Sequence, residues 1–267
     1  MQGVQVRFES VHKTYRRRDG TEVPALAGVD LAVASSEFVS LVGPSGCGKS
    51  TLLLIAAGLL PPTSGRVVFE GDAGGRPRTA VVFQEFALFP WRTVLDNVAF
   101  GLEVRGVARA ERLERAAALV RQVGLSGFES RYPHELSGGM RQRVGIARAL
   151  CVDPAVLLMD EPLSALDAQT RQLLQEDILR LWEATRKTVL YVTHNIQEAV
   201  FLSDRVVVMS RRPGRVREVL PVPFPRPRTE ALLADPEFGR FCHRIWSSLK
   251  EEARAALEET HGDGSPA

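Results

Sequence analysis

A glycine-rich segment in the first fifth of the chain has the residue types and spacing of a phosphate-binding loop. It matches the pattern G-x-x-x-x-G-K-[ST] over Gly43, Pro44, Ser45, Gly46, Cys47, Gly48, Lys49, Ser50 and Thr51. Glycines allow backbone N–H groups to curl around phosphate oxygens, and a following helix adds its positive N-terminal end. Lys49 is expected to reach the β- and γ-phosphates of a nucleotide, and Ser50 to ligate Mg²⁺. The alternative, a glycine turn with a solvated lysine, is disfavoured because a predicted strand precedes the segment and a predicted helix follows it.

Two adjacent carboxylates, Asp160 and Glu161, follow the apolar segment 155–159. An apolar segment this short is typical of a strand that is buried on both faces. Asp160 could hold Mg²⁺ through a water molecule, and Glu161 could polarise an attacking water. The alternative is a helix N-cap acid near Pro162. Because two acids at the exit of a buried strand are costly unless a cation or a reaction uses them, the chemical role is favoured.

The elements around these residues are expected to alternate between strand and helix. Strands are predicted within 4–42 and at 65–71, 79–83, 155–159, 188–193 and 205–210. Helices are predicted at 49–60, over much of 94–150, and in a later segment where Leu174, Ile178 and Leu181 recur at helical spacing. This alternation is typical of an α/β fold.

The sequence changes character after Ser210. Prolines occupy alternate positions from Pro221 to Pro227, which predicts an extended, stiff connector. A helical stripe follows and is expected to pack on the main body. It is formed by Phe238, Phe241, Cys242, Ile245, Trp246 and Leu249.

The composition excludes several classes of protein. With 45% hydrophobic and 25% charged residues the chain has a globular balance, and its longest apolar segment, 52–60, is shorter than the ~20 residues of a membrane-spanning helix. A net charge of +2 argues against a dedicated nucleic-acid binder. Cys47, Cys151 and Cys242 have no paired spacing, so neither a disulfide framework nor a zinc site is expected. The first residues are not expected to form a secretory signal, and any membrane-spanning part is expected to belong to another chain.

Residues 136–143, which begin Leu-Ser-Gly-Gly, could on their own be a helix start capped by Ser137. Together with the phosphate loop and the acid pair, they resemble the signature motif of the ABC transporter ATPases. Further elements of that family follow in order: Gln84 ends a predicted strand, 164–167 follow the acid pair, and His194 ends the predicted strand 188–193. The resemblance covers about residues 4–250.

The resemblance implies an α/β fold with a P-loop NTPase core, an N-terminal antiparallel β subdomain and an inserted α-helical signature subdomain. It implies one ABC ATPase domain over 4–250, which divides into a core of 1–91 and 151–212, a helical subdomain of 92–150 and a C-terminal extension of 213–258. Residues 259–267 are expected to form a disordered tail.

The resemblance also implies how ATP is bound. Two copies of the chain, or one copy and a related ATPase subunit, are expected to face each other head to tail. Each ATP would lie between the Lys49 loop of one chain and Ser137, Gly138 and Gly139 of the other. Tyr15 matches the position of an aromatic residue that stacks on adenine in the family.

Catalytic roles carry over in the same way. The resemblance implies that Glu161 is the base, that His194 contacts the γ-phosphate, and that Gln84 links Mg²⁺ and the attacking water to the helical subdomain. Lys49 would assist catalysis by its charge. The expected Mg²⁺ ligands are Ser50, Gln84 and Asp160. Asp167 is expected to organise the dimer contact.

A finer resemblance concerns the kind of transporter. Residues 84–98, 211–215, 225–228 and 236–238 resemble the ATPases of nitrate, sulfonate and taurine importers. This implies a peripheral subunit at the cytoplasmic face of the cell membrane. Its expected partners are transmembrane permease subunits and, indirectly, a periplasmic or extracellular solute-binding protein, whereas nucleic acid is not an expected partner.

Other classes of ABC ATPase stay open as alternatives. Polyamine and sugar importers share 87–90, but their ATPases usually carry an extra β-rich domain of about a hundred residues, and only 53 residues follow Gly214. Importers of a thiamine precursor are a further alternative. ABC ATPases of DNA repair usually contain long coiled coils, and those of translation two cassettes, neither of which the sequence shows.

Two more expectations concern accessible side chains. Residues 84–100 are expected to dock onto the permease, with Phe86, Phe89 and Trp91 as exposed anchors. The alternative is that these rings fill the joint between two subdomains. Cys47 lies inside the phosphate loop, so a bulky thiol reagent is expected to inhibit the protein, and ATP to protect it.

Overall fold

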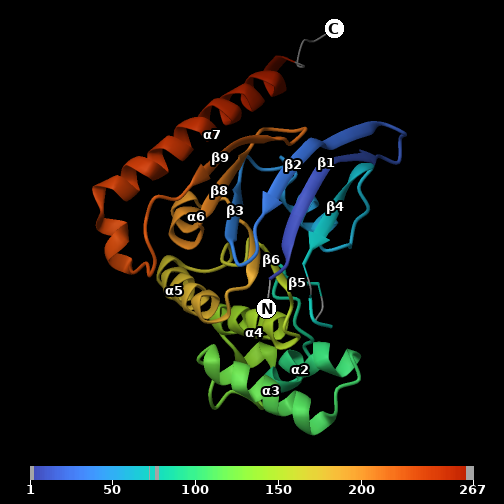
Figure 1. Ribbon diagram of the computed structural model, residues 1–267, viewed down its shortest axis with the longest axis vertical. Helices are drawn as coiled ribbons and strands as arrows, with labels where there is room; N and C mark the ends of the chain where they lie inside the picture. Colours follow the sequence, from blue (N-terminus) through green and yellow to red (C-terminus); the bar gives the residue numbers. More distant parts are fainter. Residues whose placement is uncertain (1–2, 72, 76–77, 263–267) are drawn as a thin grey trace. The chain divides into compact units, whose positions relative to one another are not determined.

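The computed structural model describes residues 3–71, 73–75 and 78–262 (Figure 1). The chain forms two units, one of residues 1–4 and 71–189 and the other of 5–70 and 190–267. None of the helices in the described ranges combines the length and the apolar character that crossing a bilayer requires. Of the expected tail 259–267, the first four residues continue the last helix, and 263–267 lie outside the described residues.

An antiparallel sheet opens the second unit because apolar residues alternate with polar ones along its first strand. Its order is β2-β1-β4, with β1 at Gln5–Arg16, β2 at Glu22–Val33 and β4 at Ser64–Glu70. Val6 pairs with Val33 on one side and with Phe69 on the other. Val6 and Phe8 are buried, as the period of two predicts.

The same unit holds the parallel strands that carry the phosphate loop. Strand β3 (Phe38–Val42) pairs in parallel with β8 (Arg205–Met209), and all five residues of β3 are buried. The chain re-enters this unit within β7 (Thr188–Val192) and continues into α6 (Ile196–Leu202). Helix α1 follows the loop but spans Lys49–Ala56, shorter than the predicted 49–60. Gly58, at φ 71°, closes the helix before Pro61.

A strand that was not predicted precedes the proline-rich connector and ends at its first proline. Strand β9 (Val216–Pro221) pairs antiparallel with β8. The strand lies at the end of its sheet, where a proline without an N–H group is tolerated. Beyond it come the short helix η2 (Glu230–Ala234) and the long helix α7 (Pro236–Gly262).

The predicted stripe of α7 is only partly correct. Phe238, Ile245 and Leu249 are buried, at spacings of seven and four residues that define one helical face. Trp246 lies about 100° around the helix from Ile245 and is 52% exposed. The expectation that Trp246 packs inward is therefore wrong.

The first unit contains the predicted helical region and a pair of parallel strands. Strand β5 (Thr79–Val82) pairs with β6 (Val156–Asp160). The helices are α2 (Val94–Val104), α3 (Arg109–Gln122), the one-turn η1 (Pro133–Glu135), α4 (Gly138–Cys151) and α5 (Ala168–Thr185). Helix α5 buries Leu174, Ile178 and Leu181, which confirms the face predicted from their spacing.

Candidate functional site

The phosphate loop is a tight turn in which a side chain at Gly43 or Gly48 would crowd its neighbours. Gly48 has φ 101° and caps α1, and a β-carbon there would lie 2.6 Å from Leu26 Cδ2 and 2.9 Å from the carbonyl oxygen of Ala25. A β-carbon at Gly43 would lie 2.8 Å from Cys47 Sγ. The sequence therefore folds here into the compact strand–loop–helix that was predicted.

Lys49 is held within the loop rather than in solvent. Its side chain is 6% exposed, and Nζ donates hydrogen bonds to the carbonyl oxygens of Gly43 at 2.9 Å and Pro44 at 3.0 Å. An ammonium group, the first turn of α1 and the hydroxyls of Ser50 and Thr51 are thus gathered at one helix N-terminus. This donor set suits the oxygens of a polyphosphate.

Cys47 does not have the surroundings of a reactive thiol. The residue is 1% exposed, and burial raises the pKa of its thiol, while nearby Lys49 opposes that shift. A buried, protonated thiol is a poor nucleophile. The structure therefore contradicts the expectation that a bulky reagent reaches Cys47, and the place of Cys47 in nucleotide binding stays a prediction.

Tyr15 lies beside the loop, as expected from its match to the family. Its hydroxyl is 3.2 Å from Thr51 Oγ1, and Lys13 Nζ lies 5.4 Å from the centre of its ring. The side chain is 38% exposed. An aromatic ring is thus available next to the phosphate-binding turn, at the end of β1.

Gly214 packs against the backbone of the phosphate loop, and it was not predicted as a site residue from the sequence. A β-carbon at this position would lie 1.9 Å from the carbonyl oxygen of Cys47. Gly214 N–H donates to the Ala25 carbonyl at 2.8 Å, and Ala27 N–H donates to the Gly214 carbonyl at 3.0 Å. The sequence marks this position only by a glycine within 211–215. Those residues were interpreted as a feature of the importer group, and their contact with the phosphate loop was not predicted.

His194 lies on the segment between β7 and α6. Asn195 N–H donates to Thr193 Oγ1 at 3.0 Å, and Asn195 Oδ1 caps α6 by accepting from Glu198 N–H at 3.2 Å. Thr193 N–H donates to the carbonyl of Leu41 at the end of β3. The His194 side chain is exposed, while the backbone on both sides of it is fixed.

The acid pair lies at the end of β6 in the other unit. Asp160 is the last residue of the strand, and both acids are half-buried. Glu161 has φ 43°, a left-handed conformation that is costly for a residue other than glycine. The hydroxyl and N–H of Ser164 both donate to the Glu161 carbonyl, at 2.9 and 3.2 Å, and hold this conformation. Strain of this kind is common at catalytic positions.

The signature motif begins helix α4. Ser137 caps the helix by accepting a hydrogen bond from Met140 N–H at 3.3 Å, as predicted. A β-carbon at Gly139 would lie 2.5 Å from Thr170 Cγ2, so glycine allows α4 to approach the start of α5. Asp167 caps α5 through Thr170 N–H, and this bond lowers the pKa of its carboxyl group. The two neighbouring helix N-termini are thereby packed together.

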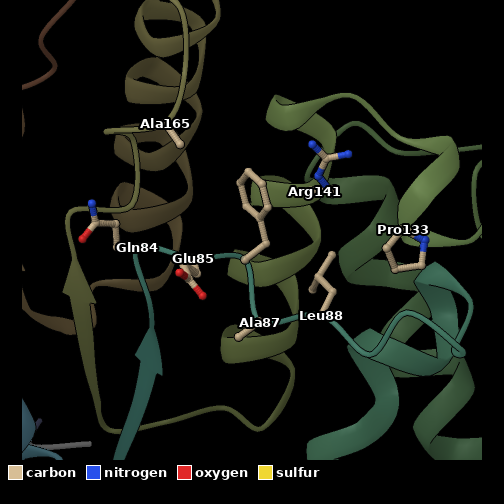
Figure 2. Close-up of a pocket in the computed structure, with 8 residues that line it drawn as sticks. Gln84, Glu85, Ala87, Leu88, Pro133, Arg141 and Ala165 are labelled. Carbon is tan, nitrogen blue, oxygen red and sulfur yellow. The ribbon is translucent and has the colours of Figure 1, made fainter.

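Gln84 opens a segment that lines a pocket of about 600 Å³ within the same unit. In Figure 2, Gln84 and Ala165 lie on one side of it, and Pro133 and Arg141 on the other. The Arg141 guanidinium lies 5.0 Å from the centre of the Phe86 ring. Polar, apolar and cationic groups thus surround one open surface.

The three aromatic residues of this segment differ in exposure. Trp91 is 72% exposed, but Phe86 and Phe89 are half-buried. Phe89 packs on Phe100 at 4.5 Å between ring centres, and its backbone is bound by the buried Asn97. The prediction of exposed anchors therefore holds for Trp91 alone.

Known proteins resemble this chain over most of its length. The sequence model of the ABC transporter family matches residues 26–164. An uncharacterized ABC transporter ATP-binding protein of Methanocaldococcus jannaschii is 48% identical over 96% of this chain and 95% of its own length. Taurine import ATP-binding protein TauB is 47% identical in Rhizobium johnstonii, over 92% of this chain and 94% of its own length. TauB of Escherichia coli is 46% identical over 87% of this chain and 94% of its own length.

A solved structure also matches this fold. The dimeric ATP-binding cassette MJ0796, in a post-hydrolysis state bound to ADP and Pi, covers 82% of this chain and 99% of its own, with a TM-score of 0.71 and 35% identity. This likeness confirms the predicted fold class, a P-loop NTPase core with an antiparallel β subdomain and an α-helical part. The chain belongs to the ABC transporter family and is one of its ATP-hydrolysing cassettes.

Proposed function

We propose that this cassette powers the import of taurine, another sulfonate, nitrate or a related small solute. The observation that carries the proposal is the 47% identity to a taurine import ATP-binding protein over 92% of the chain. The resemblance of 84–98, 211–215, 225–228 and 236–238 supports the same group of importers. The proposed single domain, 4–250, has a core of 1–91 and 151–212, a helical subdomain of 92–150 and a C-terminal extension of 213–258.

ATP is bound through the residues of the phosphate loop and their neighbours. The loop amides and Lys49 hold the phosphates, and Tyr15 offers its ring to adenine. Ser50, Gln84 and Asp160 would hold Mg²⁺, whose chemical contribution is to neutralise charge on the β- and γ-phosphates. Hydroxyl, amide and carboxylate oxygens are ligands that suit this hard cation.

Hydrolysis then needs a positioned water and a stabilised γ-phosphate. Glu161, held at φ 43° by Ser164, accepts the proton of the attacking water. His194 donates a hydrogen bond to the γ-phosphate while charge shifts during attack. Gln84 would contact Mg²⁺ and the attacking water, and the residues that follow it, 85–88, line the pocket.

The site is completed by a second copy of the chain. The N-terminus of α4, with Ser137, Gly138 and Gly139, faces the γ-phosphate of the ATP bound to the partner. The dimeric cassette bound to ADP and Pi supports this arrangement. A two-fold axis then gives two equivalent sites, each incomplete within one chain.

The permease is expected to dock on the pocket of 84–88 and on neighbouring Trp91, at the cytoplasmic face of the membrane. A large exposed aromatic residue beside a pocket with a cation is a common anchor of protein interfaces. A solute-binding protein on the opposite side of the membrane would act only through the permease.

Transport is tested by assembling the cassette with its permease and solute-binding protein in proteoliposomes. Taurine, another alkanesulfonate or nitrate is expected to accumulate only when ATP is present on the cassette side. Spermidine, maltose and a thiamine precursor serve as comparison solutes. Accumulation of one of these three, with none of the first group, would assign the cassette to another importer class.

A further inference from the structure

Arg228 is a buried arginine whose guanidinium group lies against the C-terminal end of helix α6. Its side chain is 6% exposed, and Nη1 donates to the carbonyl oxygens of Val200 at 2.9 Å, Phe201 at 3.0 Å and Ser203 at 2.7 Å. The last carbonyls of a helix lack partners within it, and a cation there matches the negative end of the helix dipole. Arg228 therefore closes α6 from a segment outside that helix.

The segment that carries Arg228 is itself fastened on two sides. Arg228 Nη2 donates to the Phe224 carbonyl at 3.0 Å, and the Phe224 ring packs 5.8 Å from that of Phe238 on α7. Arg226 donates to Asp204 Oδ1 at 2.8 Å, just beyond α6. The chain between β9 and η2 thus runs alongside α6 (Figure 1) and grips its C-terminal end with both arginines.

The other end of α6 begins next to His194. Seven residues make a helix of about 10 Å, too short to bend between its ends. Its cap, Asn195, is tied to Thr193 and Glu198, and the buried Glu198 carboxylate accepts a hydrogen bond from Tyr191 on β7. Because the helix is short and stiff, a shift of its C-terminal end is expected to displace Asn195 and, with it, the backbone beside His194.

We propose that Arg228 is a positioning residue for ATP hydrolysis, which acts through α6 to hold His194 against the γ-phosphate. This inference rests on the role proposed for His194. Since the phosphate loop and Lys49 bind ATP, loss of Arg228 should lower kcat and leave KM almost unchanged. The Pro-Arg-Pro-Arg sequence of 225–228 would thus support ATP hydrolysis by holding α6 in place.

A double-mutant cycle with His194 tests the inference in the purified full chain. Arg228→Met is expected to lower kcat about tenfold with KM within about twofold of wild type. In a His194→Ala background, the same Arg228→Met change is expected to alter kcat by less than about twofold, because its route of action is already gone. Arg244→Met, which removes an ion pair between α7 and Glu218 on β9, is the control and should keep wild-type kcat. A radiometric assay resolves the residual activity of the slow variants.

Each outcome decides between the two proposals. If the losses from Arg228→Met and His194→Ala multiply in the double variant, Arg228 acts independently of His194 and the inference is wrong. If His194→Ala hydrolyses ATP at the wild-type rate, the proposed role of His194 is wrong instead.

A second variant covers the case in which Arg228→Met does not fold, as judged by circular dichroism. Arg228→Lys keeps the charge but loses the planar fork of donors, so kcat should fall about threefold and the fall should vanish in the His194→Ala background. A folded Arg228→Lys variant with wild-type kcat would overturn the inference.

Discussion

Gly214 packs so closely against Cys47 that a β-carbon at residue 214 would lie 1.9 Å from the Cys47 carbonyl oxygen. This contact links the turn between β8 and β9 to the middle of the phosphate loop. The close atom of Cys47 belongs to the backbone, and the backbone of Gly214 is also hydrogen-bonded to Ala25 and Ala27. Neither side can therefore move without breaking hydrogen bonds.

Gly214→Ala is expected to displace the phosphate loop and weaken ATP binding by about tenfold or more, a change of about 1.4 kcal/mol. Isothermal titration with ATP measures the loss. Gly239→Ala on α7 is the matched control, because a β-carbon there meets nothing within 4 Å. Equal ATP affinity in Gly214→Ala and wild type would show that the loop does not depend on this contact.

Lys49→Ala removes the buried ammonium group of the loop. We expect ATP binding or hydrolysis to fall by at least an order of magnitude, an electrostatic effect of about 1.4 kcal/mol or more. The exposed Lys250→Ala is the control for a general loss of positive charge. Near-normal hydrolysis by the purified Lys49→Ala variant would contradict the assignment of the loop.

The cysteines of the folded protein should react slowly with a thiol reagent at pH 7.5. Burial raises the pKa of Cys47, and raises the pKa of Cys151 and Cys242 to about 11. Since the thiolate is the reactive form, labelling of the half-buried Cys242 should speed up about tenfold per pH unit between pH 8 and 10. Peptide mapping by mass spectrometry assigns the label. Cys47 labelling as fast in the folded as in the urea-unfolded protein would contradict the buried position of its thiol.

Trp91→Asp should release the cassette from membranes that contain its permease, while ATP binding by the purified protein stays intact. A carboxylate in place of the exposed ring would be desolvated without a partner at an interface. Cell fractionation measures the membrane-bound share. Trp246→Asp is the control, since Trp246 is a similarly exposed tryptophan on α7. Release by both variants, or by neither, would argue against Trp91 as the anchor.

The sequence predicted features that depend on local pattern. The glycine spacing of 43–51, the apolar strand before Asp160 and the spacing of Leu174, Ile178 and Leu181 each led to the element that the structure contains. These features follow from residue periodicity and turn chemistry, which a single segment displays.

Features that depend on distant segments were not predictable in this way. Strand β9 forms because it pairs with β8, although its last residue is Pro221 and more prolines follow in the connector. Gly214 and Arg228 matter through the backbone that each one meets, at Cys47 and at the end of α6. No periodicity marks such contacts, because they are set by tertiary packing.

The central claim, an ATP-dependent dimer with Glu161 as the base, is tested most directly by Glu161→Gln. The amide keeps the shape of the side chain but cannot accept the proton, and loss of a general base costs about 10²–10⁴-fold in rate. ATP binding should survive, because Lys49 and the loop amides are unchanged.

Size-exclusion chromatography with saturating ATP and Mg²⁺ is the decisive measurement, with Glu114→Gln on α3 as the control. We predict that Glu161→Gln elutes as a dimer that retains unhydrolysed ATP, while the wild type and the control elute mainly as monomers. A Glu161→Gln variant that stays monomeric would contradict the dimer in which Ser137 and Gly139 complete the partner's site. One that hydrolyses ATP at the wild-type rate would contradict Glu161 as the base.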